Sequence, residues 1–217
     1  MRILDICKLT KQFQKDVLGS FREYYPSDQS AIDAINQTTL NPQARIQSVA
    51  TWIKLYGVHR IGGCTADNIA RILIDFSDKN KKLVSPLTVV QINEEFVRLE
   101  AALRVGLHLN DRAIESLTSK TLWLRYPHDV PILDLNAERA LRMLARIKAK
   151  PFPKEKNRYK QFVDVWSHFY SQIESVVNLD PLYPYKIRVF DRLLWWLGNG
   201  SFATADESLR DGIGVAP

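Results

Sequence analysis

Residues 162–177 read FVDVWSHFYSQIESVV, and this stretch indicates the fold class more directly than any other. Its apolar side chains recur every three or four residues, a spacing that places them on one face of a helix. They are Phe162, Val165, Trp166, Phe169, Ile173, Val176 and Val177. A stripe of this kind usually packs into a core, so we interpret it as the buried face of an amphipathic helix.

The same spacing runs through most of the chain, whereas the strict alternation of a half-buried strand is hard to find. We therefore predict an all-α fold. The expected helices cover residues 3–24, 29–37, 42–56, 65–77, 87–106, 110–126, 136–149, 155–178 and 184–198. We expect one two-lobed helical domain over 1–199 and a flexible C-terminal tail over 200–217, where small and polar residues prevail.

Several residues agree with these helix boundaries. Asn41 precedes Pro42, which pairs a capping side chain with a first-turn proline, and Thr65 is a capping residue before an acidic first turn. Gly57, Gly106 and Gly198 each fall where a predicted helix ends, as glycine commonly does.

Composition excludes several classes of protein. Of the 217 residues, 46% are hydrophobic and 25% are charged, which is typical of a soluble globular protein. The N-terminal residues lack the apolar core of a signal peptide, and no stretch approaches the roughly 20 apolar residues of a membrane span. We therefore expect a cytoplasmic protein that does not engage a membrane.

Metal and cofactor sites have little support in the sequence. The two cysteines, Cys7 and Cys64, are too few for a four-cysteine zinc site or an iron–sulfur cluster. The four histidines show no metal-ligand spacing, and no phosphate loop, dinucleotide-binding glycine series or serine elbow occurs. We expect no metal and no cofactor.

Positive charge is concentrated in one segment. The chain has 30 Lys and Arg against 24 Asp and Glu, a net charge of +6. Residues 138–160 alone contain nine basic and two acidic residues, a net +7, so the remainder of the chain is at −1. This segment favours a polyanion-binding surface over a solvated face of mixed charge, although the second reading stays open. The candidate contacts are Arg139, Arg142, Arg146, Lys148, Lys150 and Lys154.

Asp134 stands directly before this basic segment. An apolar run, Val130-Pro131-Ile132-Leu133, leads to it, and a helix is expected to begin around Asn136. Asp134 therefore lies at a helix N-terminus, where the backbone dipole and free N–H groups stabilise a carboxylate. A plain capping aspartate would have the same surroundings, so geometry alone favours a cap.

Two segments resemble a known enzyme family. The run PILDLNAERAL over 131–141 resembles the segment of helix-hairpin-helix DNA glycosylases in which an apolar approach leads to the catalytic aspartate, then to an arginine five residues on. Ser119-Lys120-Thr121 resembles the place of the nucleophilic lysine in the bifunctional members. The combination of SKTLW over 119–123, the Tyr126-Pro127 link and VPILD over 130–134 is closer still to the bacterial 8-oxoguanine-glycosylase-like branch, and residues 185–196 also resemble the final helix of that group.

The resemblance implies a two-lobed helical domain with a degenerate helix-hairpin-helix. Ser116-Leu117-Thr118-Ser119 stand where the family has a glycine-containing turn that grips a DNA phosphate, and they contain no glycine. Lys120 and Asp134 are 14 residues apart, about one helical turn closer than in standard members.

The function implied is excision of a modified base from double-stranded DNA by a monomer. The base would be flipped out of the duplex, Asp134 would stabilise the cationic sugar left behind, and Lys120 would form a Schiff base that permits cleavage at the abasic site. The substrate would be 8-oxoguanine or a hypermodified cytosine of phage DNA, the latter in antiviral defence.

Further residues are candidates for holding the DNA. Trp123, Tyr126, Trp195 and Trp196 would line the base pocket, although each is also a candidate for the core. Arg60 lies in a glycine-rich loop that would contact the DNA backbone or simply join two helices.

Two readings from other classes stay open. In the first, a non-catalytic helical module binds nucleic acid through residues 138–160, and Asp134 merely caps a helix. In the second, the chain is a helical scaffold for another protein and binds DNA weakly.

Overall fold

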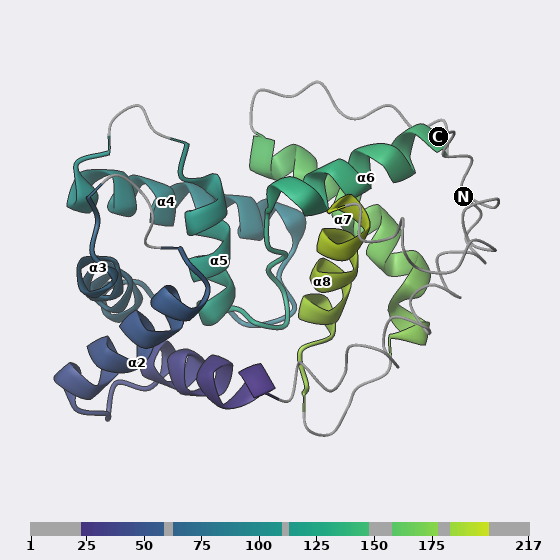
Figure 1. The fold of residues 1–217 in the computed structure, drawn as a ribbon. Helices are drawn as coiled ribbons and strands as arrows, with labels where there is room; N and C mark the ends of the chain where they lie inside the picture. The colour runs from purple at the N-terminus through teal and green to yellow at the C-terminus, as the bar shows by residue number, and fades with distance from the viewer. Residues whose placement is uncertain (1–22, 59–62, 110–112, 148–157, 178–182, 200–217) are drawn as a thin grey trace. The chain divides into compact units, whose positions relative to one another are not determined.

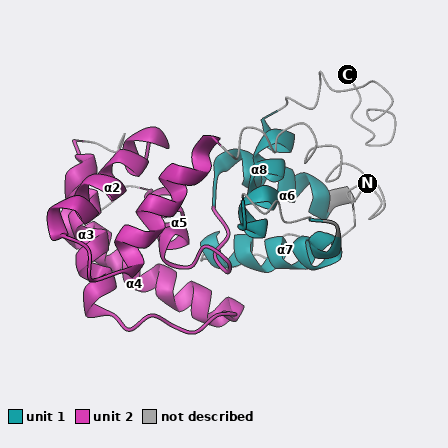
Figure 2. Ribbon diagram, turned by 90° about the horizontal axis from the view of Figure 1, so that it is seen from below, with its two compact units in different colours: residues 1–19, 133–217 teal, residues 20–132 magenta. Residues whose placement is uncertain are grey.

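The computed structural model describes residues 23–58, 63–109, 113–147, 158–177 and 183–199 (Figure 1). Within these ranges the regular elements are all helices, so the predicted all-α fold class is confirmed. The chain divides into two compact units, residues 1–19 with 133–217 (unit 1) and residues 20–132 (unit 2) (Figure 2). The predicted tail over 200–217 lies outside the described residues. Among the described helices, none is long and apolar enough to cross a membrane.

Unit 2 contains a helix over residues 23–36 followed by α2 (Pro42–Leu55), α3 (Ala66–Lys79), α4 (Val89–Leu107) and α5 (Glu115–Arg125). Each of the last three packs against the helix before it. Side-chain hydrogen bonds close to the helix in sequence mark the starts of α2, α3 and α4. Asn41 accepts hydrogen bonds from the amides of Gln43 and Ala44, Thr65 caps α3, and Thr88 forms a capping box with Gln91.

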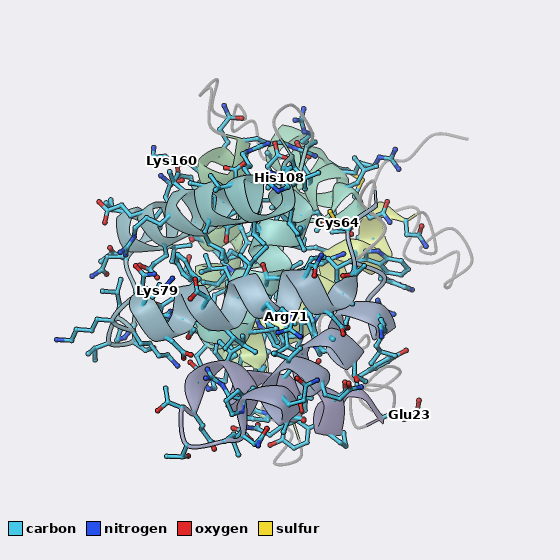
Figure 3. The ribbon with its side chains drawn as sticks, turned by 90° about the vertical axis from the view of Figure 1, so that its left-hand side faces the viewer. Glu23, Cys64, Arg71, Lys79, His108 and Lys160 are labelled. Atoms are coloured by element: carbon cyan, nitrogen blue, oxygen red, sulfur yellow. The ribbon has the colours of Figure 1, made fainter. Side chains whose placement is uncertain are left out.

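Aromatic and aliphatic side chains fill the core of unit 2. Trp52 and Trp123 are fully buried and stack with ring centroids 6.2 Å apart. The Trp52 indole donates to the buried carboxylate of Asp28 at 2.7 Å, so this acidic side chain is satisfied inside the core. By contrast, α3 carries Arg71 and Lys79 on its solvent face (Figure 3).

One predicted helix break is wrong. We expected one helix to end at residue 24 and another to begin at 29, whereas residues 23–36 form a continuous helix. The reason is tertiary, because Asp28 accepts hydrogen bonds from Trp52 of α2 and from Tyr56 directly after it, and these bonds anchor the intervening residues.

Two other boundaries also differ. Gly106 lies inside the last turn of α4, and the left-handed residue that ends this helix is His108, with φ 54°. A Cβ at Gly106 would lie 2.6 Å from the Cδ1 of Ile72 on α3, so this glycine permits close helix packing. Helix α5 begins at Glu115 rather than near 110, because Ile114 is not helical (φ −120°, ψ 10°).

Unit 1 contains α6 (Leu135–Ile147), α7 (Arg158–Ile173), the short 3₁₀ helix η1 (Glu174–Val176) and α8 (Lys186–Gly198). Helix α6 packs against both α8 and α7. The stripe predicted from residues 162–177 is buried as expected at its described side chains. Within this stripe, the indole of Trp166 donates to the buried Asp191 of α8 at 2.8 Å.

Candidate active site

The chain between α5 and α6 holds the apolar approach to Asp134. A turn after Tyr126 is closed by the amides of Asp129 and Val130, which both donate to the Tyr126 carbonyl at 3.1 Å. Val130 is completely buried, and Ile132 and Leu133 are nearly so. Val130 and Ile132 belong to unit 2, and Leu133 begins the segment of unit 1 that contains Asp134.

Asp134 caps α6, as the sequence predicted for its position. Its Oδ1 accepts a hydrogen bond from the Asn136 amide at 2.9 Å, and its carbonyl accepts the first intrahelical bond, from the Glu138 amide. The side chain is half-buried. The carboxylate thus lies at the helix end that carries partial positive charge.

The last turn of α8 holds this helix start in place. A Cβ at Gly198 would lie 1.8 Å from the Asn136 carbonyl oxygen, so only glycine allows the two backbones to approach this closely. The Asn136 side-chain amide also donates to Asn199 Oδ1 at 3.5 Å. The sequence predicts only that Gly198 ends a helix, whereas in the structure it also permits this contact with α6. The carboxyl end of α8 therefore contacts the amino end of α6, a favourable arrangement of the two helix dipoles.

The basic segment is partly neutralised inside unit 1. Glu138 is 4% exposed and accepts hydrogen bonds from Arg142 of α6 and Arg158 of α7, each through Nε at 3.0 Å and Nη2 at 2.5 Å. Burial acts to raise the pKa of Glu138, but the hydrogen bonds and charges of Arg158 and Arg142 outweigh it and lower the pKa. In the sequence Glu138 is only one negative charge in a basic segment, whereas in the structure its ion pair with Arg158 links α6 to α7.

The faces of α6 agree with the prediction. Leu141 and Leu144 are buried, while Arg139 and Arg142 are exposed. Among the described residues, Arg139 has no carboxylate partner and donates only weakly to Asn136 Oδ1, at 3.5 Å. The side chain of Arg146 lies outside the described residues, as do the other basic candidates, Lys148, Lys150, Lys154 and Arg60.

Lys120 lies in α5 of unit 2 and is half-buried, between the buried side chains of Ser119 and Thr121. The residues matched to the family's hairpin turn, 116–119, are helical, and the Thr118 amide donates to the Ile114 carbonyl at 2.8 Å. The degenerate helix-hairpin-helix expected from the resemblance is therefore not confirmed, and the Thr118 amide is used within α5. Asp134 belongs to unit 1.

The four aromatic candidates separate into two pairs. Trp123 and Tyr126 are core residues of unit 2, with 0% and 1% exposure. In this structure they therefore pack in the core, which was the alternative to a place in the base pocket. The Tyr126 hydroxyl donates to the buried Glu95 at 2.8 Å. Trp195 and Trp196 are half-buried on α8, and the Arg192 guanidinium lies 4.5 Å from the Trp195 ring centroid.

Unit 1 therefore brings together Asp134, the first turn of α6 with Asn136, and the end of α8 that carries Trp195 and Trp196. Within the described ranges, no three His, Cys, Asp or Glu side chains form a group that could hold a metal ion. Comparison of the chain with protein-family models, curated proteins and solved structures finds no match in any of the three.

Proposed function

We propose that this chain is a DNA glycosylase that excises a modified base and uses Asp134 as its catalytic carboxylate. The observation that carries the proposal is the position of Asp134. It is a half-buried acid at the end of a buried apolar approach, held at the start of α6 by the Asn136 amide. An acid in this setting is oriented before any substrate arrives.

The reaction needs such a group because of the charge that develops on the sugar. When the N-glycosidic bond breaks, the base leaves with the bonding electrons, and positive charge is shared between C1′ and the ring oxygen. A nearby carboxylate stabilises that cation. In the hydrolytic route a water oxygen then bonds to C1′ and gives up a proton, which leaves an abasic site.

Lys120 would make the enzyme bifunctional. Its neutral amine would bond to C1′ in place of water, ring opening would give a protonated Schiff base, and elimination of the 3′ phosphate would cleave the strand. The amine must lose its proton before it can attack.

Half-exposed aromatic side chains on α8 support the same function, because a flipped base needs a stacking surface. Trp195 and Trp196 are partly exposed in the unit that carries Asp134, and Arg192 lies over the Trp195 ring. Arg139, exposed one turn into α6, would contact the phosphate backbone. The substrate would be 8-oxoguanine or a hypermodified cytosine of phage DNA.

The competing function is nucleic-acid binding without catalysis. It is favoured by one specific observation, the hydrogen bond from the Asn136 amide to Asp134, which is what a simple helix cap makes. The two functions differ in what the charge of Asp134 does, and that difference can be measured.

The test uses Asp134→Asn, because asparagine caps a helix about as well as aspartate and carries no charge. The full chain is incubated with duplexes containing 8-oxoguanine, uracil, alkylated bases or phage-type modified cytosines, and alkali-labile abasic sites are measured. We expect wild type to release at least one base and Asp134→Asn to lose this activity with its melting temperature and DNA affinity retained.

Asp164→Asn is the matched control. Asp164 lies in the same unit and pairs with Lys160 at 3.6 Å, so its loss should leave base release unchanged. Borohydride trapping with Lys120→Ala then separates the two routes, since a trapped adduct requires the amine. Absence of abasic sites from every substrate would refute the enzyme proposal and leave the binding function.

A further inference from the structure

A groove of about 590 Å³ runs between the helix of residues 23–36 and α2, which lie next to each other in unit 2 (Figure 1). The cause is the size of the facing side chains. Ser30 lies on the first helix, and Ala44 and Ser48 lie one turn apart on α2, so nothing large fills the space between them. Leu40 and Tyr25 add apolar wall, and the groove is open to solvent along one side.

Asp33 is the charged member of the described residues that line this groove. Its Oδ1 accepts hydrogen bonds from Gln29 at 2.9 Å and from Gln37 at 3.1 Å, one helical turn away on either side. Among the described residues, the other carboxylate oxygen has no hydrogen-bond or ion-pair partner. Two neutral amides therefore hold the carboxylate in a fixed direction and leave its charge uncompensated.

The position of this charge is unfavourable for the helix that carries it. Asp33 lies in the last turn of the described helical residues 23–36, where the partial charge of the helix end is negative. An acid at such a position destabilises a helix by about 0.3–1 kcal/mol in general, whereas a basic residue would stabilise it. The bonds from Gln29 and Gln37 support the helix but need no negative charge, so the charge of Asp33 is unfavourable for the helix dipole and would be compensated by a cation bound in the groove.

We propose that this groove binds an arginine or lysine side chain of a partner polypeptide. The cationic head would pair with Asp33, and the apolar walls would contact the aliphatic stem and the neighbouring apolar residues of the partner. The groove is open along its length between two helices, which suits a polypeptide segment that enters and leaves. The proposal concerns unit 2 alone and is independent of base excision.

The probe is a fluorescein-labelled peptide, Ala-Leu-Arg-Leu-Ala with blocked ends, titrated with the full-length chain and followed by anisotropy. The reference peptide carries citrulline, which has the shape of arginine without its charge. We expect saturable binding of the arginine peptide and at least about tenfold weaker binding of the citrulline peptide, because the pair with Asp33 is charge-assisted.

Three variants locate the binding. Asp33→Asn should weaken binding of the arginine peptide about tenfold with an unchanged melting temperature, and Ala44→Leu should abolish it by filling the groove. Asp75→Asn is the matched control, because Asp75 is an exposed acid on α3 that pairs with Lys79 at 2.9 Å and does not line the groove.

Three results would overturn the proposal. They are equal affinity for the arginine and citrulline peptides, full affinity in Asp33→Asn, and no saturable binding at all. Size-exclusion chromatography over a range of concentrations tests whether a second copy of this chain occupies the groove instead. Dimerisation that Asp33→Asn abolishes, without peptide binding by the monomer, would assign the groove to a second copy of this chain and refute the peptide partner.

Discussion

Replacing Gly198 by alanine tests whether the close contact between α8 and α6 positions Asp134. The added Cβ would lie 1.8 Å from the Asn136 carbonyl oxygen and 2.5 Å from its carbonyl carbon. Real Cβ contacts essentially never fall below 3.0 Å, so the two backbones must separate by at least 1.2 Å. The obstacle is backbone that also carries the amide bonded to Asp134, and no side-chain rotation can relieve it.

The expected loss of stability follows from two opposing effects. Overpacking a tight contact destabilises a protein by about 1–3 kcal/mol, and a backbone obstacle belongs at the upper end. Alanine regains at most about 1 kcal/mol of helix propensity over glycine. The net loss is about 2 kcal/mol, which corresponds to a melting temperature lower by about 4–8 °C for a chain of this size.

Gly106→Ala is the matched control, measured by the same thermal and urea denaturation. Its Cβ would also meet a neighbour too closely, 2.6 Å from Ile72 Cδ1, but that atom ends a flexible side chain. Rotation of Ile72 relieves the contact, and the gain in helix propensity offsets what remains, so we expect a change within about 1 kcal/mol of zero. Equal stability of Gly198→Ala and wild type, or a larger loss in Gly106→Ala, would refute the reasoning.

Three further predictions concern charge. Because the pKa of Glu138 is lowered in the folded state, its stabilisation is present above the unfolded pKa near 4.5 and is lost as pH falls through the folded pKa. Glu138→Gln should therefore be about 2 kcal/mol less stable at pH 7, and its denaturation midpoint should vary less with pH below about 4.5 than that of wild type. Burial and the charge of Arg125 lower the pKa of Lys82 despite the opposing charge of Asp129, so an amine-acylating reagent at pH 8 should modify Lys82 faster than exposed Lys79, as read by peptide mass spectrometry. For DNA binding, residues 138–160 should contribute no more than about −5 to the measured slope of log affinity against log salt, because Arg142 and Arg158 are held by Glu138 and Lys160 pairs with Asp164, which leaves at most six of the nine basic residues of this segment to contact phosphates.

Local signals predicted the helices well. Asn41 with Pro42 and Thr65 mark helix starts through bonds to amides two or three residues away, and such bonds depend on little outside the segment. The position of Asp134 was predictable for the same reason. The break expected within 23–36 failed because the deciding bonds come from Trp52 and Tyr56, more than 20 residues along the chain.

The composition of the site was harder to predict, because burial depends on tertiary packing. A tryptophan such as Trp123 and one such as Trp195 look alike in sequence, yet the first is fully buried and the second is partly exposed. Likewise, the net charge of 138–160 does not show that Glu138 is buried and forms ion pairs with Arg142 and Arg158. Arg158 lies on α7, so this contact depends on how two helices pack. The sequence did contain one signal for the burial of Glu138, because this acid lies beside the apolar positions Ala137 and Leu141 of α6.

Capping and catalysis by Asp134 are compatible, because each uses a different property of the same side chain. The cap needs one oxygen that accepts the Asn136 amide, which asparagine also provides. Stabilising a cationic sugar needs the negative charge, which asparagine lacks. The cap orients the carboxylate at the start of α6, where the helix dipole places partial positive charge. A helix cap at this position would therefore preorganise a catalytic acid, so the hydrogen bond from the Asn136 amide is compatible with either function.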